Sequence, residues 1–221
     1  MQNQHVISLK VLFEANRIED NAVQMEKYMH GKFSFIGLKA KERRDISKTF
    51  MKEVDFHQED VESIIRTLWE MPEREYQYVA VDYLVKNKKC LTDSHLELLE
   101  YLITTKSWWD TIDAIASHLV GIVFQKNPHL IIDWGEKWLD SGNIWLQRTM
   151  LLFQLKYKEK TDKKLLASII LRLKDIDEFF IQKAIGWSLR EYSKTNPEFV
   201  STYIEKQELS NLAIREGSKY I

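Results

Sequence analysis

A repeat of about 35 residues is the feature of this sequence that most restricts its fold. When Trp109, Trp145 and Phe180 are aligned, the segments SWWDTIDAI, NIWLQRTML and EFFIQKAIG fall into register, and Glu75 lies about one step further upstream. A period of this length built from helix pairs is typical of an α-solenoid. The chain lacks the tetratricopeptide pattern, which favours HEAT-like repeats. We therefore expect an all-α solenoid whose stacked helix pairs form a curved superhelix with a concave inner surface.

The local pattern of apolar residues agrees with helices throughout. Ile64, Ile65, Leu68 and Trp69 have the spacing of a buried helix face. The chain of 221 residues has only seven glycines and three prolines, whereas ordinary domains contain roughly 7% Gly and 5% Pro. This shortage of turn residues disfavours sandwiches and barrels. We expect one HEAT-like domain over residues 1–221.

Three sites carry helix-start signals. The dipeptides Asn127-Pro128 and Asn196-Pro197 each offer an N-cap followed by proline at the first helical position. Ser107 and Asp110 have the spacing of a capping box, which predicts a helix that begins at Trp108.

Charge and termini restrict the partners and the compartment. Thirty-two Lys and Arg against 33 Asp and Glu give a net charge of −1, so a nucleic acid would have to meet a local basic patch. The N-terminus has no secretory signal and no segment is apolar enough to span a bilayer. A lone cysteine, Cys90, suits a reducing compartment. We expect a cytoplasmic protein.

Stacking of repeats places equivalent positions side by side. In this alignment Asp113 shares its position with Thr149, and Arg148 shares its position with Ile112 and Lys183. Trp109 and Asp113 are four residues apart, so they lie on one helix face. Together with Arg148, and with Trp187 one turn beyond Lys183, we expect these side chains to meet in one groove.

Several kinds of chemistry lack their residues here. The six histidines are scattered and have no cysteine partner except Cys90, so we expect no metal site. Neither a Gly-rich phosphate loop nor a Gly-x-Ser-x-Gly motif occurs. No cofactor is expected.

A single carboxylate between tryptophans suits one reaction, the release of a leaving group that is already cationic. Most glycoside hydrolases need two carboxylates, but an N-alkylated purine carries its own positive charge and needs no acid. Indole faces attract such a cation. The alternative is that Asp113 caps a helix or pairs with a basic residue and that the tryptophans are core. The chain would then be a non-catalytic HEAT-repeat module that binds DNA or protein.

At these residues the sequence resembles the AlkD family of bacterial DNA alkylation-repair glycosylases. The similarity covers nearly the whole chain. Its most specific stretches are LWEMPEREYQYVA, TKSWWDTIDAI, NIWLQRTMLLFQLKYKEK and EFFIQKAIGWSLREYSKTNP. The resemblance implies a groove that binds double-stranded DNA, and excision of N3- and N7-alkylated purines without metal or organic cofactor.

The resemblance also implies residue roles. Asp113 would stabilise the deoxyribosyl cation and position water, while Trp109 and Trp187 would contact the cationic nucleotide. Arg148 would contact the DNA backbone. Tyr28 would add a contact from an N-terminal helix, whose pattern continues to Phe33.

Further basic residues fit either of two interpretations. Lys156, Lys183 and Arg190 could bind phosphates, or they could belong to ordinary solvated faces. An open solenoid of this kind is expected to be a monomer.

Overall fold

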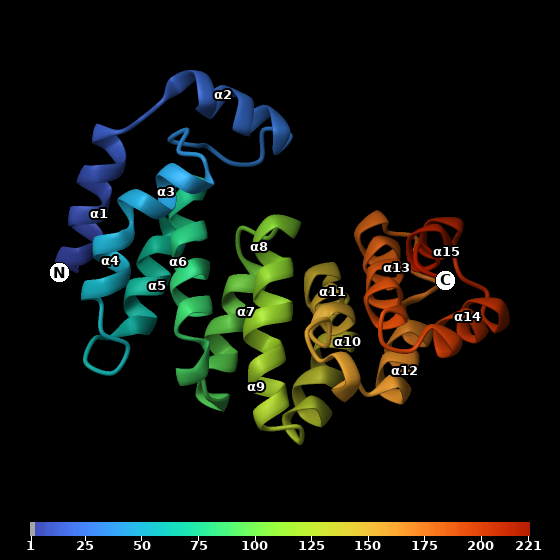
Figure 1. Cartoon of the computed structure of the whole chain (residues 1–221). Coiled ribbons are helices and arrows are strands. Elements are labelled where there is room, and N and C mark those ends of the chain that lie inside the picture. Colours follow the sequence, from blue (N-terminus) through green and yellow to red (C-terminus); the bar gives the residue numbers. More distant parts are fainter. Residues whose placement is uncertain (1–2) are drawn as a thin grey trace. The chain divides into compact units, whose positions relative to one another are not determined.

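The structure is a computed structural model that describes residues 3–221, and these residues are mostly helical (Figure 1). Within them no strand forms, and the β-type pairing found is an isolated parallel bridge between Ser34 and Glu73. The all-α class of paired, repeating helices predicted from the sequence is therefore confirmed.

Contacts within the chain group into two compact units, which divide between Cys90 and Leu91. The single domain predicted over residues 1–221 and the curvature predicted for the whole array stay predictions.

The first unit has a core that draws on most of its helices. Phe13 and Tyr76 are fully buried and their ring centroids lie 5.2 Å apart. Its elements are α1 (Gln4–Ala15), α2 (Glu19–Tyr28), α3 (Ala40–Ile46), α4 (Lys48–Glu53), α5 (Val61–Glu70), α6 (Arg74–Lys86) and the 3-10 turn η1 (Lys88–Cys90).

The second unit is a run of stacked helices. Its elements are η2 (Asp93–His95), α7 (Leu96–Thr104), α8 (Trp109–Ala114), the π-helical turn η3 (Ile115–Val120), α9 (Gly121–Lys126), the π-helical turn η4 (Ile131–Gly135), α10 (Glu136–Asp140), α11 (Ile144–Leu152), η5 (Lys158–Lys160), α12 (Lys163–Leu173), α13 (Phe179–Ser193), α14 (Pro197–Lys206) and α15 (Asn211–Gly217). Helix α8, η3 and α9 follow one another without a break. Helix α11 packs against both α8 and α13, and α15 packs against α13.

The second helices of successive pairs begin at intervals of 35 residues. Their first residues are Arg74 in α6, Trp109 in α8, Ile144 in α11 and Phe179 in α13. The repeat length predicted from the sequence is therefore correct.

The predicted register is wrong by one residue between the first two aligned segments. Trp109 is the first residue of α8, whereas Trp145 is the second residue of α11. Equivalent positions are therefore Asp113, Arg148 and Lys183, and Thr149 does not share the Asp113 position. The error arose because two tryptophans were aligned that occupy different positions on their helices.

The two Asn-Pro signals have different outcomes. At Asn196-Pro197 the prediction is confirmed: the Asn196 side chain accepts a hydrogen bond from the amide of Phe199 at 3.0 Å, and the proline is the first residue of α14. At Asn127-Pro128 it is wrong, because a turn follows the proline and η4 begins only at Ile131.

The capping box predicted at Ser107 is also wrong. Its hydroxyl donates to the carbonyl of Ile103 at 2.6 Å, in the preceding helix α7, so it is not the cap of α8. Helix α8 begins at Trp109, one residue later than predicted, with Trp108 at the N-cap.

Helix α2 is shorter than its apolar pattern indicates. It ends at Tyr28, because His30 and Gly31 adopt left-handed backbone with φ of 54° and 67°. Phe33 therefore lies outside the helix, where the Arg74 guanidinium sits 3.9 Å from its ring centroid. The prediction of a continuous helix through Phe33 is wrong.

Candidate functional site

A cavity of about 340 Å³ lies in the second unit, where α8, α11 and α13 meet. Its lining residues are Trp109, Asp113, Arg148, Phe179, Phe180, Lys183, Trp187 and Arg190. The three residues predicted as catalytic and three of those predicted to bind DNA are therefore brought together, whereas Tyr28 and Lys156 are elsewhere.

Asp113 and Arg148, which both line this cavity, form a bidentate ion pair. Arg148 Nε donates to Asp113 Oδ1 at 2.8 Å and Nη2 donates to Oδ2 at 3.1 Å. The Arg148 side chain is 4% exposed and that of Asp113 is 18% exposed. The 35-residue repeat produces this pair, because it places the two side chains at the same position of neighbouring helices.

Burial and charge act on Asp113 in opposite directions. Loss of solvent raises the pKa of the Asp113 carboxyl above its ordinary value, and the hydrogen bonds and positive charge of Arg148 partly oppose this rise. Two parallel N–H donors also fix the plane of the carboxylate. The result is an oriented acidic group with limited access to water.

Each of the three guanidinium nitrogens of Arg148 donates a hydrogen bond to another group of the protein. Its remaining nitrogen, Nη1, donates to the backbone carbonyl of Phe180. In this structure the guanidinium therefore orients Asp113, and a contact with the DNA backbone stays a prediction.

Aromatic side chains make up much of the cavity wall. Trp109 and Trp187 are half-buried and come from α8 and α13. Phe180 also lines the cavity, and its ring centroid lies 5.0 Å from those of both Trp108 and Trp145. One ring of the cavity wall, that of Phe180, thus belongs to a packed aromatic cluster.

Phe179 was missed in the sequence as a site residue. It is the first residue of α13, lines the cavity and is 59% exposed. Its ring stands nearly perpendicular to that of Phe180, with centroids 5.3 Å apart. The sequence signal at this position is the Phe-Phe pair of EFFIQKAIG, and the pair alone does not tell which of the two rings is exposed.

Lys183 and Arg190 are held by a carboxylate that sequence reasoning also missed. Lys183 Nζ lies 2.8 Å from Glu216 Oε1, and Arg190 Nη1 lies 2.9 Å from Glu216 Oε2. Glu216 is on α15, which begins 32 residues after α13 instead of 35, so the register of the repeat does not carry over to it. No spacing rule within the repeat could therefore have found it.

Two predicted DNA contacts lie outside the cavity. Tyr28 is the last residue of α2 in the first unit and is 67% exposed. Lys156 is exposed in the turn after α11. Their accessibility is compatible with the predicted roles, which stay predictions.

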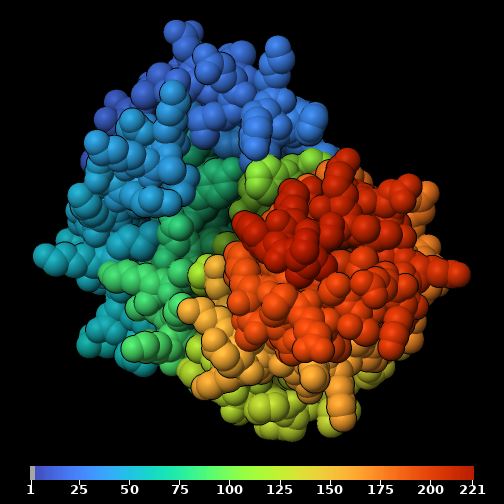
Figure 2. Space-filling view, turned by 45° about the vertical axis from the view of Figure 1, so that its right-hand side comes forward, coloured from blue at the N-terminus to red at the C-terminus, as the bar shows by residue number. Residues whose placement is uncertain are grey.

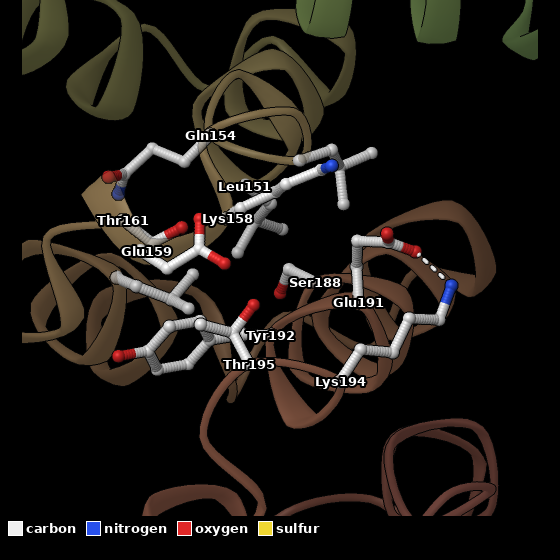
Figure 3. A pocket seen from close by; sticks show the side chains of 12 residues that line it. Leu151, Gln154, Lys158, Glu159, Thr161, Ser188, Glu191, Tyr192, Lys194 and Thr195 are labelled. Carbon is white, nitrogen blue, oxygen red and sulfur yellow. Dashed lines mark hydrogen bonds and ion pairs between the residues drawn. The ribbon is translucent and has the colours of Figure 1, made fainter.

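A second cavity, of about 260 Å³, lies between the turn after α11 and the C-terminal half of α13 (Figure 3). No tryptophan is among its lining residues, all of which belong to the described chain. Its charged residues balance in sign, and Glu191 is paired with Lys194 at 2.7 Å. It lacks the partly exposed carboxylate between indoles, so the Asp113 cavity is the candidate site.

Two further properties concern the described chain as a whole. Across residues 3–221, no three His, Cys, Asp or Glu side chains are grouped so that they could hold a metal ion. None of the helices found there has both the length and the apolar character needed to cross a bilayer.

Comparisons with known proteins agree on one family. The family model described as DNA alkylation repair enzyme matches residues 9–221. A solved structure named as a predicted DNA alkylation repair enzyme from Enterococcus faecalis is 36% identical and has a TM-score of 0.85, over 93% of this chain and 96% of that one.

Two more distant structures share the fold. They are smu.31 and AlkD2, both from Streptococcus mutans, and each is 18% identical with a TM-score of 0.61. The match covers 90% of this chain and 97% of smu.31, and 82% of this chain and 89% of AlkD2. No curated protein matches the chain significantly.

Proposed function

Because the chain belongs to the DNA alkylation repair enzyme family, we propose that it is a DNA N-glycosylase that releases N3- and N7-alkylated purines from duplex DNA. The observation that carries this proposal is the Asp113 carboxylate, oriented by Arg148 and set in one cavity with Trp109 and Trp187. Among the residues of the described chain that line this cavity, Asp113 alone is acidic.

One carboxylate is enough for this reaction. The bond between C1′ of the deoxyribose and N9 of the purine breaks, and its electron pair moves to the cationic purine, which leaves as a neutral base. Positive charge develops on the sugar, where the Asp113 carboxylate stabilises it. Water then adds to C1′, and its proton passes to solvent by way of the carboxylate. No acid is required, since the departing base carries its positive charge from the start.

The aromatic wall explains why a cationic base would be selected. A cation over an indole face gains about 0.5–2 kcal/mol, most when water is excluded. Trp109 and Trp187 each offer such a face, whereas an undamaged purine is neutral and forgoes this gain. The cations Lys183 and Arg190 at the same cavity suit the phosphates beside the lesion.

A base-release assay tests the proposal. The protein is incubated with a duplex that contains 7-methylguanine, and abasic sites are revealed by hot alkali. We expect release well above the spontaneous rate, and none from the same duplex with unmodified guanine. Release at the spontaneous rate would contradict the proposal. Salt-sensitive binding without release would identify a lesion-binding module, and salt-resistant binding to a protein would identify a scaffold.

The pH dependence of release is expected to report on Asp113. The mechanism needs the ionised carboxylate, so the rate should fall as pH falls through the pKa of this group. Burial raises that pKa above the ordinary 3.8, so the midpoint of the acid limb should lie above this value. Single-turnover rates measured over about pH 4 to 8, with folding checked by circular dichroism at each pH, give the midpoint. A profile without an acid limb would exclude an ionised Asp113 from the reaction.

Phe179 is expected to contribute to DNA binding rather than to bond cleavage. Replacement with alanine should raise the Kd for the lesion duplex about fivefold to tenfold, since an aromatic contact with a base or sugar is worth about 1–3 kcal/mol, and should leave the saturated release rate unchanged. Leu171→Ala is the matched control, because Leu171 is 53% exposed on α12 and does not line the cavity. Equal Kd values for the two variants would remove Phe179 from the binding surface.

A further inference from the structure

Glu216 stands at the centre of a cluster of three cations in the second unit. Its side chain is 5% exposed and lies 2.8 Å from Lys183 Nζ, 2.9 Å from Arg190 Nη1 and 2.8 Å from Lys219 Nζ. Hydrogen bonds from Lys183 and Lys219 lower the pKa of Glu216 to about 2. The carboxylate is therefore ionised under ordinary conditions, and three positive charges share one negative charge.

The close approach of α15 to α13 brings this carboxylate into place. Helices α15 and α13 are in contact, and Figure 2 shows the red residues of the C-terminal end against the orange residues that precede them. Gly186 permits the contact, since a Cβ atom there would lie 2.5 Å from Glu216 Cβ and 2.8 Å from the carbonyl oxygen of Ala213. Any larger residue would push the two helices apart, and Glu216 would leave its partners.

Two of the three cations face the candidate site. Lys183, Trp187 and Arg190 follow one another at i, i+4 and i+7 on α13, so they share one face of the helix, and all three line the Asp113 cavity. The Lys183 and Arg190 side chains are 37% and 22% exposed. Glu216 thus fixes two cations, one on each side of an indole, that an anion from solvent can still reach.

We propose that Glu216 is a positioning residue that holds Lys183 and Arg190 ready to contact the phosphates of the DNA strand whose base enters the Asp113 cavity. This inference rests on the proposed function. Lysine and arginine side chains lose much conformational freedom when they are fixed on binding. Fixing them beforehand removes that cost and sets their distance from Asp113. Three cations surround one carboxylate, so the cluster keeps a net positive charge. Lys183 and Arg190 can therefore bind phosphate while both oxygens of Glu216 remain hydrogen-bonded.

Glu216→Gln tests this role, because it keeps the shape of the side chain and removes its charge. We expect the single-turnover rate of 7-methylguanine release, measured with the enzyme in excess, to fall about tenfold. Binding of an undamaged duplex should not weaken, since the cluster gains net positive charge. The plot of log K against log salt should become steeper by about one, because one more cation is free to displace a counterion.

A merely structural role would give a different pattern. It would lower the melting temperature and weaken release and binding together, without steepening the salt dependence. Glu100→Gln is the matched control: Glu100 is a half-buried carboxylate of the same unit that accepts from Lys137 at 2.7 Å and from Trp138 at 3.0 Å, and it does not line the cavity. The release rate and the salt slope of the Glu100→Gln protein should equal those of the wild type.

The outcomes separate this inference from the proposed function. A folded Glu216→Gln protein with the wild-type release rate and salt slope would overturn the inference. If that variant does not fold, Lys183→Gln and Arg190→Gln replace it, and wild-type release and binding in both would overturn it. If the wild type releases no 7-methylguanine, the proposed function fails, and the salt slope on undamaged duplex still decides: a slope unchanged by Glu216→Gln would overturn the positioning role.

Discussion

Replacement of Asp113 with asparagine should lower the single-turnover rate of 7-methylguanine release about 100- to 1,000-fold, the loss typical when one group that stabilises transition-state charge is removed. The asparagine side chain has the same shape and one oxygen that can still accept from Arg148. It lacks the negative charge that would stabilise the deoxyribosyl cation. DNA affinity should change little, because Asp113 repels phosphate rather than binding it. The measurements are the release rate with enzyme in excess and the Kd for the lesion duplex.

The control for this variant is Asp110→Asn. Asp110 lies three residues earlier on the same helix α8 and does not line the cavity. Asp110 is half-buried and its charge contributes to the raised pKa of Asp113. At a pH where Asp113 is ionised in both proteins, the release rate of Asp110→Asn should therefore stay within about twofold of the wild type. Melting temperatures establish that both variants are folded. A wild-type rate in Asp113→Asn would place the chemistry on another residue.

The pairing of Asp113 with Arg148 could be predicted from the sequence for a specific reason. Asp113 and Arg148 stand at the same position of repeats that begin 35 residues apart, so repetition alone places them side by side. The prediction that they converge was correct although the register was wrong by one residue, because the helices that carry Trp109, Asp113 and Arg148 meet at one cavity. Trp109 and Trp187 were predicted to join this groove, and they line it.

The position of Glu216 could not be predicted in this way. Glu216 reaches Lys183 and Arg190 from α15, and its position depends on how closely that helix packs at Gly186. Helix α15 begins 32 residues after α13, not 35, so the repeat does not predict which of its residues reach α13. The capping box predicted at Ser107 failed because its hydroxyl donates instead to the carbonyl of Ile103 in the preceding helix.

Glu75 shows the same limit in the first unit. It served in the sequence only as a marker of the repeat, yet it is fully buried on α6 and binds a loop 37 to 39 residues upstream. Its Oε1 accepts from the amides of Ile36 at 3.1 Å, Gly37 at 2.8 Å and Leu38 at 3.1 Å, and Oε2 also accepts from Ile36 at 3.1 Å. Burial raises the pKa of Glu75, and these amides oppose the rise. The contact of Glu75 with these amides depends on the path of the loop, which the sequence pattern does not predict.

Glu75→Ala should therefore be strongly destabilising. It leaves three buried amides without an acceptor, and each unsatisfied donor costs about 1–3 kcal/mol. We expect the free energy of unfolding of the first unit to fall by about 3–5 kcal/mol, within the range seen when one member of a buried polar network is removed. Urea denaturation measures the loss. Hydrogen exchange at Ile36, Gly37 and Leu38 should accelerate most.

Two further variants serve as controls for the predicted loss of stability in Glu75→Ala. Glu75→Gln keeps one oxygen at the loop but places an N–H₂ group opposite the amide of Ile36, so it should lose about 1–2 kcal/mol. Glu62→Ala removes an exposed carboxylate paired with Arg66 at 2.8 Å, and it should lose no more than about 1 kcal/mol. Equal losses in Glu75→Ala and Glu62→Ala would show that the loop finds other acceptors.

Glu75→Ala also tests whether the contact between Glu75 and the loop at Ile36 supports DNA binding. The loop at Ile36 holds the start of α2, because the Ile18 amide donates to the Ile36 carbonyl at 2.9 Å, and Gly37 (φ 95°) leaves no room for a Cβ beside the carbonyl oxygen of Ile18. Helix α2 carries Tyr28. At temperatures where Glu75→Ala is still folded, its DNA affinity should fall by the same factor as that of Tyr28→Ala, while the saturated release rate stays at the wild-type value. A loss of rate at saturation would mean that the loop acts on the Asp113 cavity itself.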